Sequence, residues 1–136
     1  MTTGQEVFDR AMRLLGYTDI YGQADSLQYA DLYKRGLPVV NQIYSDLWWA
    51  GHAAGRGGMR REVFSELTAL EQPLELTPRC IADIAPYGVA MLLAQGMGDG
   101  DNQALFASLY GQKRACGSRT ASRLDVLPSR RAHHAV

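Results

Sequence analysis

The most restrictive feature of the sequence is a long apolar stretch, TPRCIADIAPYGVAMLLAQG, which starts at Thr77. The pair Thr77–Pro78 is a helix-start signal, because threonine caps a helix N-terminus and proline fits its first position. Pro86 predicts a kink or a restart, since proline lacks the amide hydrogen that a helix interior uses. The stretch therefore predicts a buried helix, and its small residues would let a neighbouring helix approach closely: Ala85, Gly88, Ala90 and Ala94.

The next residues, GMGDGDN, place two carboxylates one residue apart, which suits either a metal site or a tight turn. A calcium-binding helix-loop-helix needs a glycine at the sixth loop position and a glutamate at the twelfth. Counted from Asp99, the sequence has alanine and tyrosine there, so we expect no metal. We expect a structural turn in which Gly98 and Gly100 take unusual backbone angles. Asp99 or Asp101 would then cap the following helix.

A first helix is predicted near the start of the sequence. Thr3 and Glu6 have the spacing of a capping box, in which each residue satisfies a backbone amide of the other. Gly16 lies where a left-handed residue would end the helix. The apolar residues between them recur at helical spacing: Val7, Phe8, Ala11, Met12, Leu14 and Leu15.

A second helix is predicted after a loop at residues 17–25, with Asp25 as its N-cap. Pro38 lies inside it, so we expect a kink or a break near Arg35–Leu37. The helix should end near Trp49. Trp48 is expected in the core, whereas Trp49 suits the core and a partner-facing surface equally well. Its apolar stripe consists of Leu27, Ala30, Tyr33, Leu37, Val40, Ile43, Tyr44, Leu47 and Trp48.

Glycine and arginine dominate the following stretch, GHAAGRGGMRR at residues 51–61, and this composition predicts a mobile loop. Its arginines are Arg56, Arg60 and Arg61. They suit contact with the phosphates of a nucleic acid or with a partner, and equally a solvated loop on an acidic body.

Two further elements complete the predicted fold. Residues 62–76 are expected to form a short helical turn and then an extended stretch from Pro73 to Leu76. Residues 102–115 should form a last helix, with Leu105, Phe106, Leu109 and Tyr110 facing inward. The sequence thus predicts an all-α domain over residues 1–116, a small bundle of about four helices, followed by an extended arm at residues 117–136.

Charge is distributed unevenly, although the formal net charge is zero. Residues 1–111 hold eight basic and thirteen acidic side chains, whereas residues 112–136 hold six basic and one acidic. The tail has too few apolar side chains to fold alone. Its short apolar cluster lies between arginines, which suits docking into a groove or onto a sheet edge of a partner with acidic rims. A solvated, disordered tail is the alternative. The candidate docking residues are Arg119, Arg123, Leu124, Val126, Leu127, Pro128, Arg130 and Arg131.

No arrangement of residues points to catalysis, a metal or a cofactor. Cys80 and Cys116 lie far apart and match no metal-ligand spacing, so we expect reduced, idle thiols. The sequence has no GxSxG motif, phosphate-binding loop or dinucleotide fingerprint. No carboxylate or cysteine is arranged about His52, His133 or His134. We also expect no signal peptide and no membrane span.

The order of elements resembles a known family. A short helix, RAMRLLGYTD, ends in glycine, and a second helix, RGLPVVNQIYSDLWW, carries an asparagine midway. An irregular segment leads to LTPRCIADIAPYGVAMLLA and then to NQALFASLYGQKR. Over residues 4–115 this pattern is similar to that of the head-to-tail connector (adaptor) proteins of tailed bacteriophages.

The resemblance implies a virion structural protein of the neck, assembled in the host cytoplasm. It implies a ring of about 12 copies between the portal and the next neck or tail protein, with DNA passing through the lumen without sequence-specific contact. The docking arm would map onto Gly117–Val136. The long loop at residues 51–61 departs from the family pattern, and it would meet DNA, the tail side or nothing.

Two rival functions follow from the residues alone. A small helical DNA-binding or regulatory protein should carry a basic recognition helix, whereas here the basic residues fall in the predicted loop and tail. A small hydrolase would need a nucleophile paired with a base, and the sequence offers no such pair.

Overall fold

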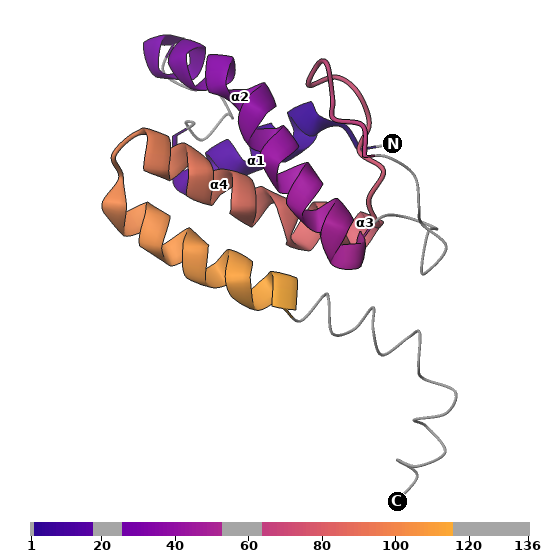
Figure 1. Cartoon of the computed structure of the whole chain (residues 1–136). Coiled ribbons are helices and arrows are strands. Elements are labelled where there is room, and N and C mark those ends of the chain that lie inside the picture. Colours follow the sequence, from indigo (N-terminus) through magenta and orange to yellow (C-terminus); the bar gives the residue numbers. More distant parts are fainter. Residues whose placement is uncertain (1, 18–25, 53–63, 116–136) are drawn as a thin grey trace, which may run out of the picture.

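The computed structural model describes residues 2–17, 26–52 and 64–115 (Figure 1). The helices in these ranges are α1 (Gly4–Leu15), α2 (Ser26–Leu47), α3 (Pro78–Asp83) and α4 (Ala85–Gly96). A π-helical turn, η1 (Trp48–His52), follows α2, and a last helix covers residues 100–115. The described ranges contain no strand, so the predicted all-α class is confirmed.

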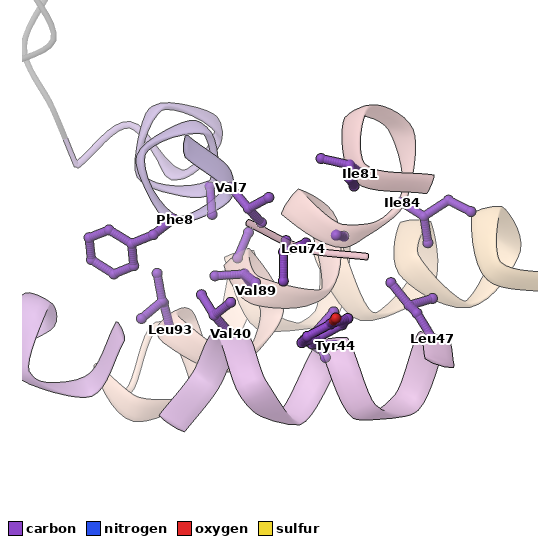
Figure 2. Close-up of a cluster of buried hydrophobic side chains, with 14 of the residues drawn as sticks. Val7, Phe8, Val40, Tyr44, Leu47, Leu74, Ile81, Ile84, Val89 and Leu93 are labelled. Carbon is purple, nitrogen blue, oxygen red and sulfur yellow. The ribbon is translucent and has the colours of Figure 1, made fainter. Parts of the chain in front are cut away.

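Helix α4 lies at the centre of the bundle, where it contacts α1, α2 and α3. The last helix runs back alongside α4 after the turn at residues 97–99 (Figure 1). The core forms where these elements meet. Figure 2 shows buried side chains from α1 (Val7 and Phe8), α2 (Val40, Tyr44 and Leu47) and α4 (Val89 and Leu93), together with Leu74, Ile81 and Ile84 from the segments between α2 and α4.

Both ends of α1 follow the sequence signals. Thr3 has an extended backbone, and its Oγ1 accepts a hydrogen bond from the amide of Glu6 at 3.3 Å. Gly16 adopts a left-handed conformation with φ of 77°. The amide of Gly16 then donates to the carbonyl of Arg13, and that of Tyr17 to the carbonyl of Met12. The predicted cap and the predicted end of this helix are confirmed.

Helix α2 runs from Ser26 to Leu47 with Pro38 inside it, so the predicted break near Arg35–Leu37 is wrong. Proline removes one backbone hydrogen bond of the helix. Burial of apolar side chains on both sides of Pro38 compensates for this loss, since Leu32 and Val40 are at most 1% exposed. The helix gives way to η1 at Trp48, close to the predicted end at Trp49. Asp25, the predicted cap, lies outside the described residues.

The segment after the undescribed residues 53–63 contains no helix in its described part, residues 64–77, so the predicted short helical turn is not found there. Residues 68–72 form a non-helical turn instead. The predicted extended stretch is confirmed, because Leu74 and Leu76 are buried while Glu75 between them is exposed. Thr3 pairs with Pro73 in an isolated antiparallel bridge.

One buried polar side chain fixes this segment against α2. Asn41 is 8% exposed, and its Nδ2 donates to the carbonyl of Leu67 at 2.9 Å. The amide of Leu67 donates back to Oδ1 of Asn41 at 2.7 Å. The side chain thereby satisfies both backbone groups of a residue that lies in no helix.

The apolar stretch forms two helices, as Pro86 indicates. Oγ1 of Thr77 accepts from the amide of Cys80 at 3.2 Å and caps α3. Ile84 separates α3 from α4, and Pro86 lies in the first turn of α4, where a proline costs no hydrogen bond. Gly88 allows the close approach expected of the small residues, because a Cβ there would lie 2.7 Å from Cε1 of Tyr110.

The last helix turns two of its four expected side chains fully inward. Phe106 and Tyr110 are buried, and Leu109 is partly buried against the core. Leu105 is 52% exposed, so its predicted inward orientation is wrong. A helix on the outside of a bundle buries only one face, and Leu105 lies outside the buried part of that face.

Candidate functional site

Most residues that the sequence marks for function lie outside the described ranges. These are the loop arginines Arg56, Arg60 and Arg61, together with Arg119, Arg123, Leu124, Val126, Leu127, Pro128, Arg130 and Arg131 of the tail. Their roles stay predictions. The structure does describe the surface that leads to the tail, which is the end of the last helix and the face of α2 beside it.

A single carboxylate ties the end of the last helix to α2. The hydroxyl of Tyr110 donates to Oδ2 of Asp46 at 2.5 Å. Nη1 of Arg114 lies 2.8 Å from Oδ1 of Asp46 and 2.7 Å from Oδ2. We call this group the Asp46 anchor. It holds the helix at Arg114, one residue before Ala115, where the described chain ends.

The two partners of Asp46 contribute differently to the anchor. Burial and the nearby Asp46 carboxylate raise the pKa of Tyr110 well above its usual value, so the hydroxyl keeps the proton that it donates. A hydrogen bond from this buried phenol to a carboxylate is charge-assisted. The side chains of Arg114 and Asp46 are 42% and 39% exposed, and such an ion pair contributes about 0–1 kcal/mol.

Sequence reasoning missed the anchor. Asp46 and Arg114 are separated by 68 positions, and neither belongs to a recognisable motif. The tyrosine was expected to face the core, but nothing in the helical pattern indicates that its hydroxyl reaches a carboxylate on α2. The only available signal was the presence of one acidic residue near the end of the α2 stripe.

The structure separates the two tryptophans. Trp48 is 3% exposed and packs edge-on against Tyr44, with ring centroids 6.2 Å apart, so its predicted place in the core is confirmed. Trp49 is 62% exposed. Of the two alternatives for Trp49, the core is therefore excluded, and a large aromatic surface lies three residues from Asp46.

An open groove follows the same exposed face of α2. Leu37, Pro38, Gln42 and Ser45 line it on the side of α2, and Phe64 and Leu67 line the other side. We call it the α2 groove. Trp49 follows Ser45 by four residues, in the π-helical turn directly after α2. The groove and the Asp46 anchor therefore flank one exposed strip of α2.

The turn at residues 97–99 is structural, as the sequence predicts. Oδ1 of Asp99 accepts from the amide of Asn102 at 3.3 Å and caps the last helix. Oδ2 of Asp99 accepts from the hydroxyl of Tyr17 at 2.8 Å, which connects the turn to the end of α1. Gly98 has φ of 71°, as expected, but Gly100 does not adopt a positive φ and instead begins the last helix. Asp101 is exposed.

These contacts change the ionisation of both groups. Hydrogen bonds from Tyr17 and Asn102 lower the pKa of Asp99 below its usual value. Burial and the Asp99 carboxylate raise the pKa of Tyr17 to about 12. A lowered carboxyl pKa stabilises the fold above the unfolded-state pKa, and this stabilisation is lost as the pH falls through the folded-state pKa.

We therefore expect Asp99→Asn to lower the melting temperature at neutral pH and to weaken its dependence on pH in the acidic range. Asp101→Asn is the matched control and should change neither. Calcium or magnesium should leave the melting temperature unchanged, whereas a bound ion at one hundred times its dissociation constant would add about 2.7 kcal/mol. Thermal unfolding from acidic to neutral pH, with and without metal, measures both effects. A metal-dependent rise that Asp99→Asn abolishes would contradict the structural role.

The one cysteine among the described residues offers no reactive thiol. Cys80 is buried, and desolvation raises its pKa to about 12, so its thiol stays protonated. No three His, Cys, Asp or Glu side chains gather into a metal-ligand set within residues 2–17, 26–52 and 64–115. Cys116, His133 and His134 lie outside these ranges, and so does the side chain of His52.

Comparisons with known proteins do not identify a family. No family model matches the chain, and neither the curated proteins nor the solved structures contain a significant match. Among the described helices, none is long and apolar enough to cross a membrane.

Proposed function

We propose that this protein is a non-enzymatic structural subunit of a phage virion, a head-to-tail adaptor that docks on the portal through residues 117–136. The main support is the uneven charge of the chain: the helical body has more acidic than basic side chains, whereas the tail has more basic than acidic ones. The sequence resemblance over residues 4–115 points the same way. The Asp46 anchor adds a mechanical reason, because it fixes the end of the body immediately before the tail.

In this proposal the tail supplies the docking contacts. Leu124, Val126 and Leu127 enter a groove or pair with a sheet edge of the portal, and the flanking arginines meet acidic side chains at its rim. Ordering the tail costs entropy, so one copy binds weakly. A ring of about 12 copies makes each later contact effectively intramolecular, which converts weak docking into a firm joint.

The remaining surfaces face other components. The exposed Trp49 suits a neighbouring copy or the neck or tail protein below the ring, since exposed tryptophans are enriched where proteins meet. Arg56, Arg60 and Arg61 face either a partner or the DNA that passes through the lumen, which they contact through phosphates without reading sequence. The proposal includes no cofactor and no membrane.

The test is binding to purified portal rings. Deletion of residues 117–136 should abolish loading while leaving the helical circular dichroism and the melting temperature nearly unchanged. In the full chain, changing Arg119, Arg123, Arg130 and Arg131 to alanine should weaken loading and reduce its dependence on salt, because exposed ion pairs are screened. Native mass spectrometry or sedimentation gives the stoichiometry. Loading of the truncated chain at the full-length stoichiometry would refute docking through the tail.

A further inference from the structure

The α2 groove has an apolar lining beside an irregular backbone segment. Leu37, Phe64 and Leu67 contribute apolar side chains to it. Glu66 lines the groove in an irregular segment, and within the described part of the chain its backbone amide donates to no other residue. An extended peptide that binds here would therefore find an apolar surface with a main-chain donor beside it, as in strand addition.

The chain's own tail starts close to this groove. The Asp46 anchor holds Arg114 against α2, and Asp46 lies nine residues from Leu37, the far end of the groove. Nine residues of helix rise about 14 Å. The ten residues from Arg114 to Leu124 span up to about 30 Å when extended. The apolar cluster of the tail can therefore reach the whole groove.

Side-chain chemistry also matches the tail to the groove. The cluster LDVLP offers Leu124 and Val126 on one face of an extended chain. Glu66 lies on the rim of the groove. Glu71 and Glu75 are exposed further along the same segment. Arginines flank the cluster on both sides, so the charges of the tail are complementary to those beside the groove.

We propose that, in the subunit that is not bound to a partner, residues 124–128 of the tail bind in the α2 groove of the same molecule. The short connection gives the tail an effective concentration in the millimolar range, so even a weak contact is substantially populated. This contact covers the apolar cluster before assembly. It must open before the tail can bind elsewhere, and it goes beyond the proposed function because it requires no portal.

Paramagnetic relaxation enhancement in the isolated full-length protein tests the contact. A nitroxide is attached to Ser129→Cys in a Cys116→Ser background, where Cys80 is buried and remains unlabelled. We expect the amide signals of Ser65, Glu66 and neighbouring groove residues to broaden strongly, and those of Asp101 and Gln103 at the start of the last helix to stay sharp. Leu124→Asp with Leu127→Asp should abolish the broadening, and the matched control Asp125→Asn should keep it.

Three outcomes would overturn the proposal. Groove amides that stay as sharp as those of Asp101 and Gln103 would place the tail elsewhere. Broadening that is equally strong in the Leu124→Asp, Leu127→Asp variant would show non-specific proximity only. Broadening of isotope-labelled chains by separate spin-labelled chains in a mixture would assign the groove to a second copy. None of these results depends on portal binding, so the contact and the proposed function fail or stand separately.

Discussion

Leu93→Ala is expected to lower the free energy of unfolding by about 2–5 kcal/mol, the usual cost of removing a buried leucine side chain. Leu93 is 1% exposed on α4, in the core that α1 and α2 also line (Figure 2). The loss has two parts, which are the transfer free energy of the deleted methyl groups and the cavity left behind. Against a total stability of about 5–15 kcal/mol, this is a severe change.

Leu105→Ala is the matched control for Leu93→Ala. It makes the same chemical change in the neighbouring helix, at a side chain that is 52% exposed, and should change the stability by no more than about 0.5 kcal/mol. Urea unfolding followed by circular dichroism measures both variants. Equal losses for the two would mean that the last helix presents a different face to α4 from the one described.

Asn41→Ala is expected to cost about 2–4 kcal/mol although it removes only one small polar side chain. The substitution leaves both the amide and the carbonyl of Leu67 without their partner, at a residue that is only 6% exposed. A buried unpaired backbone group carries the full cost of its desolvation. Gln42→Ala, on the exposed side of the same helix turn, is the control and should be nearly neutral.

The measurement for Asn41→Ala is again urea unfolding, together with amide hydrogen exchange. Exchange should accelerate first at Leu67, because its amide loses a hydrogen bond of 2.7 Å. Unchanged exchange at Leu67, or a stability equal to that of Gln42→Ala, would contradict the role assigned to the asparagine.

Local chemistry made the helix ends predictable. Four helix ends depend on contacts between residues close together in the sequence, and each was interpreted correctly. Thr3 and Thr77 cap helix starts, Gly16 ends α1 in a left-handed conformation, and Pro86 lacks the amide hydrogen that a helix interior needs. At Pro38 the break offered beside a kink does not occur, because burial along the rest of α2 outweighs the local cost of the proline. That burial is a property of the assembled bundle and leaves no local signal.

The remaining errors also depend on tertiary contacts. Leu105 fits the helical pattern as well as Phe106 does, and only the position of α4 decides which of them is covered. Gly100 was expected to share the unusual angles of Gly98, yet one left-handed residue is enough to close the turn when Asp99 caps the next helix. The Asp46 anchor joins residues 68 positions apart, and sequence patterns of helical period do not extend that far.

The position of α1 determines the order in which the molecule can be completed during synthesis. Helix α1 leaves the ribosome early, but much of its surface packs against α4, which is made later. Its first residues also pair with residues 70–74, which are made much later. At about 5–20 residues per second, α1 waits roughly 4–16 s for α4 to emerge. During that time its apolar face is open to chaperones and to other nascent chains.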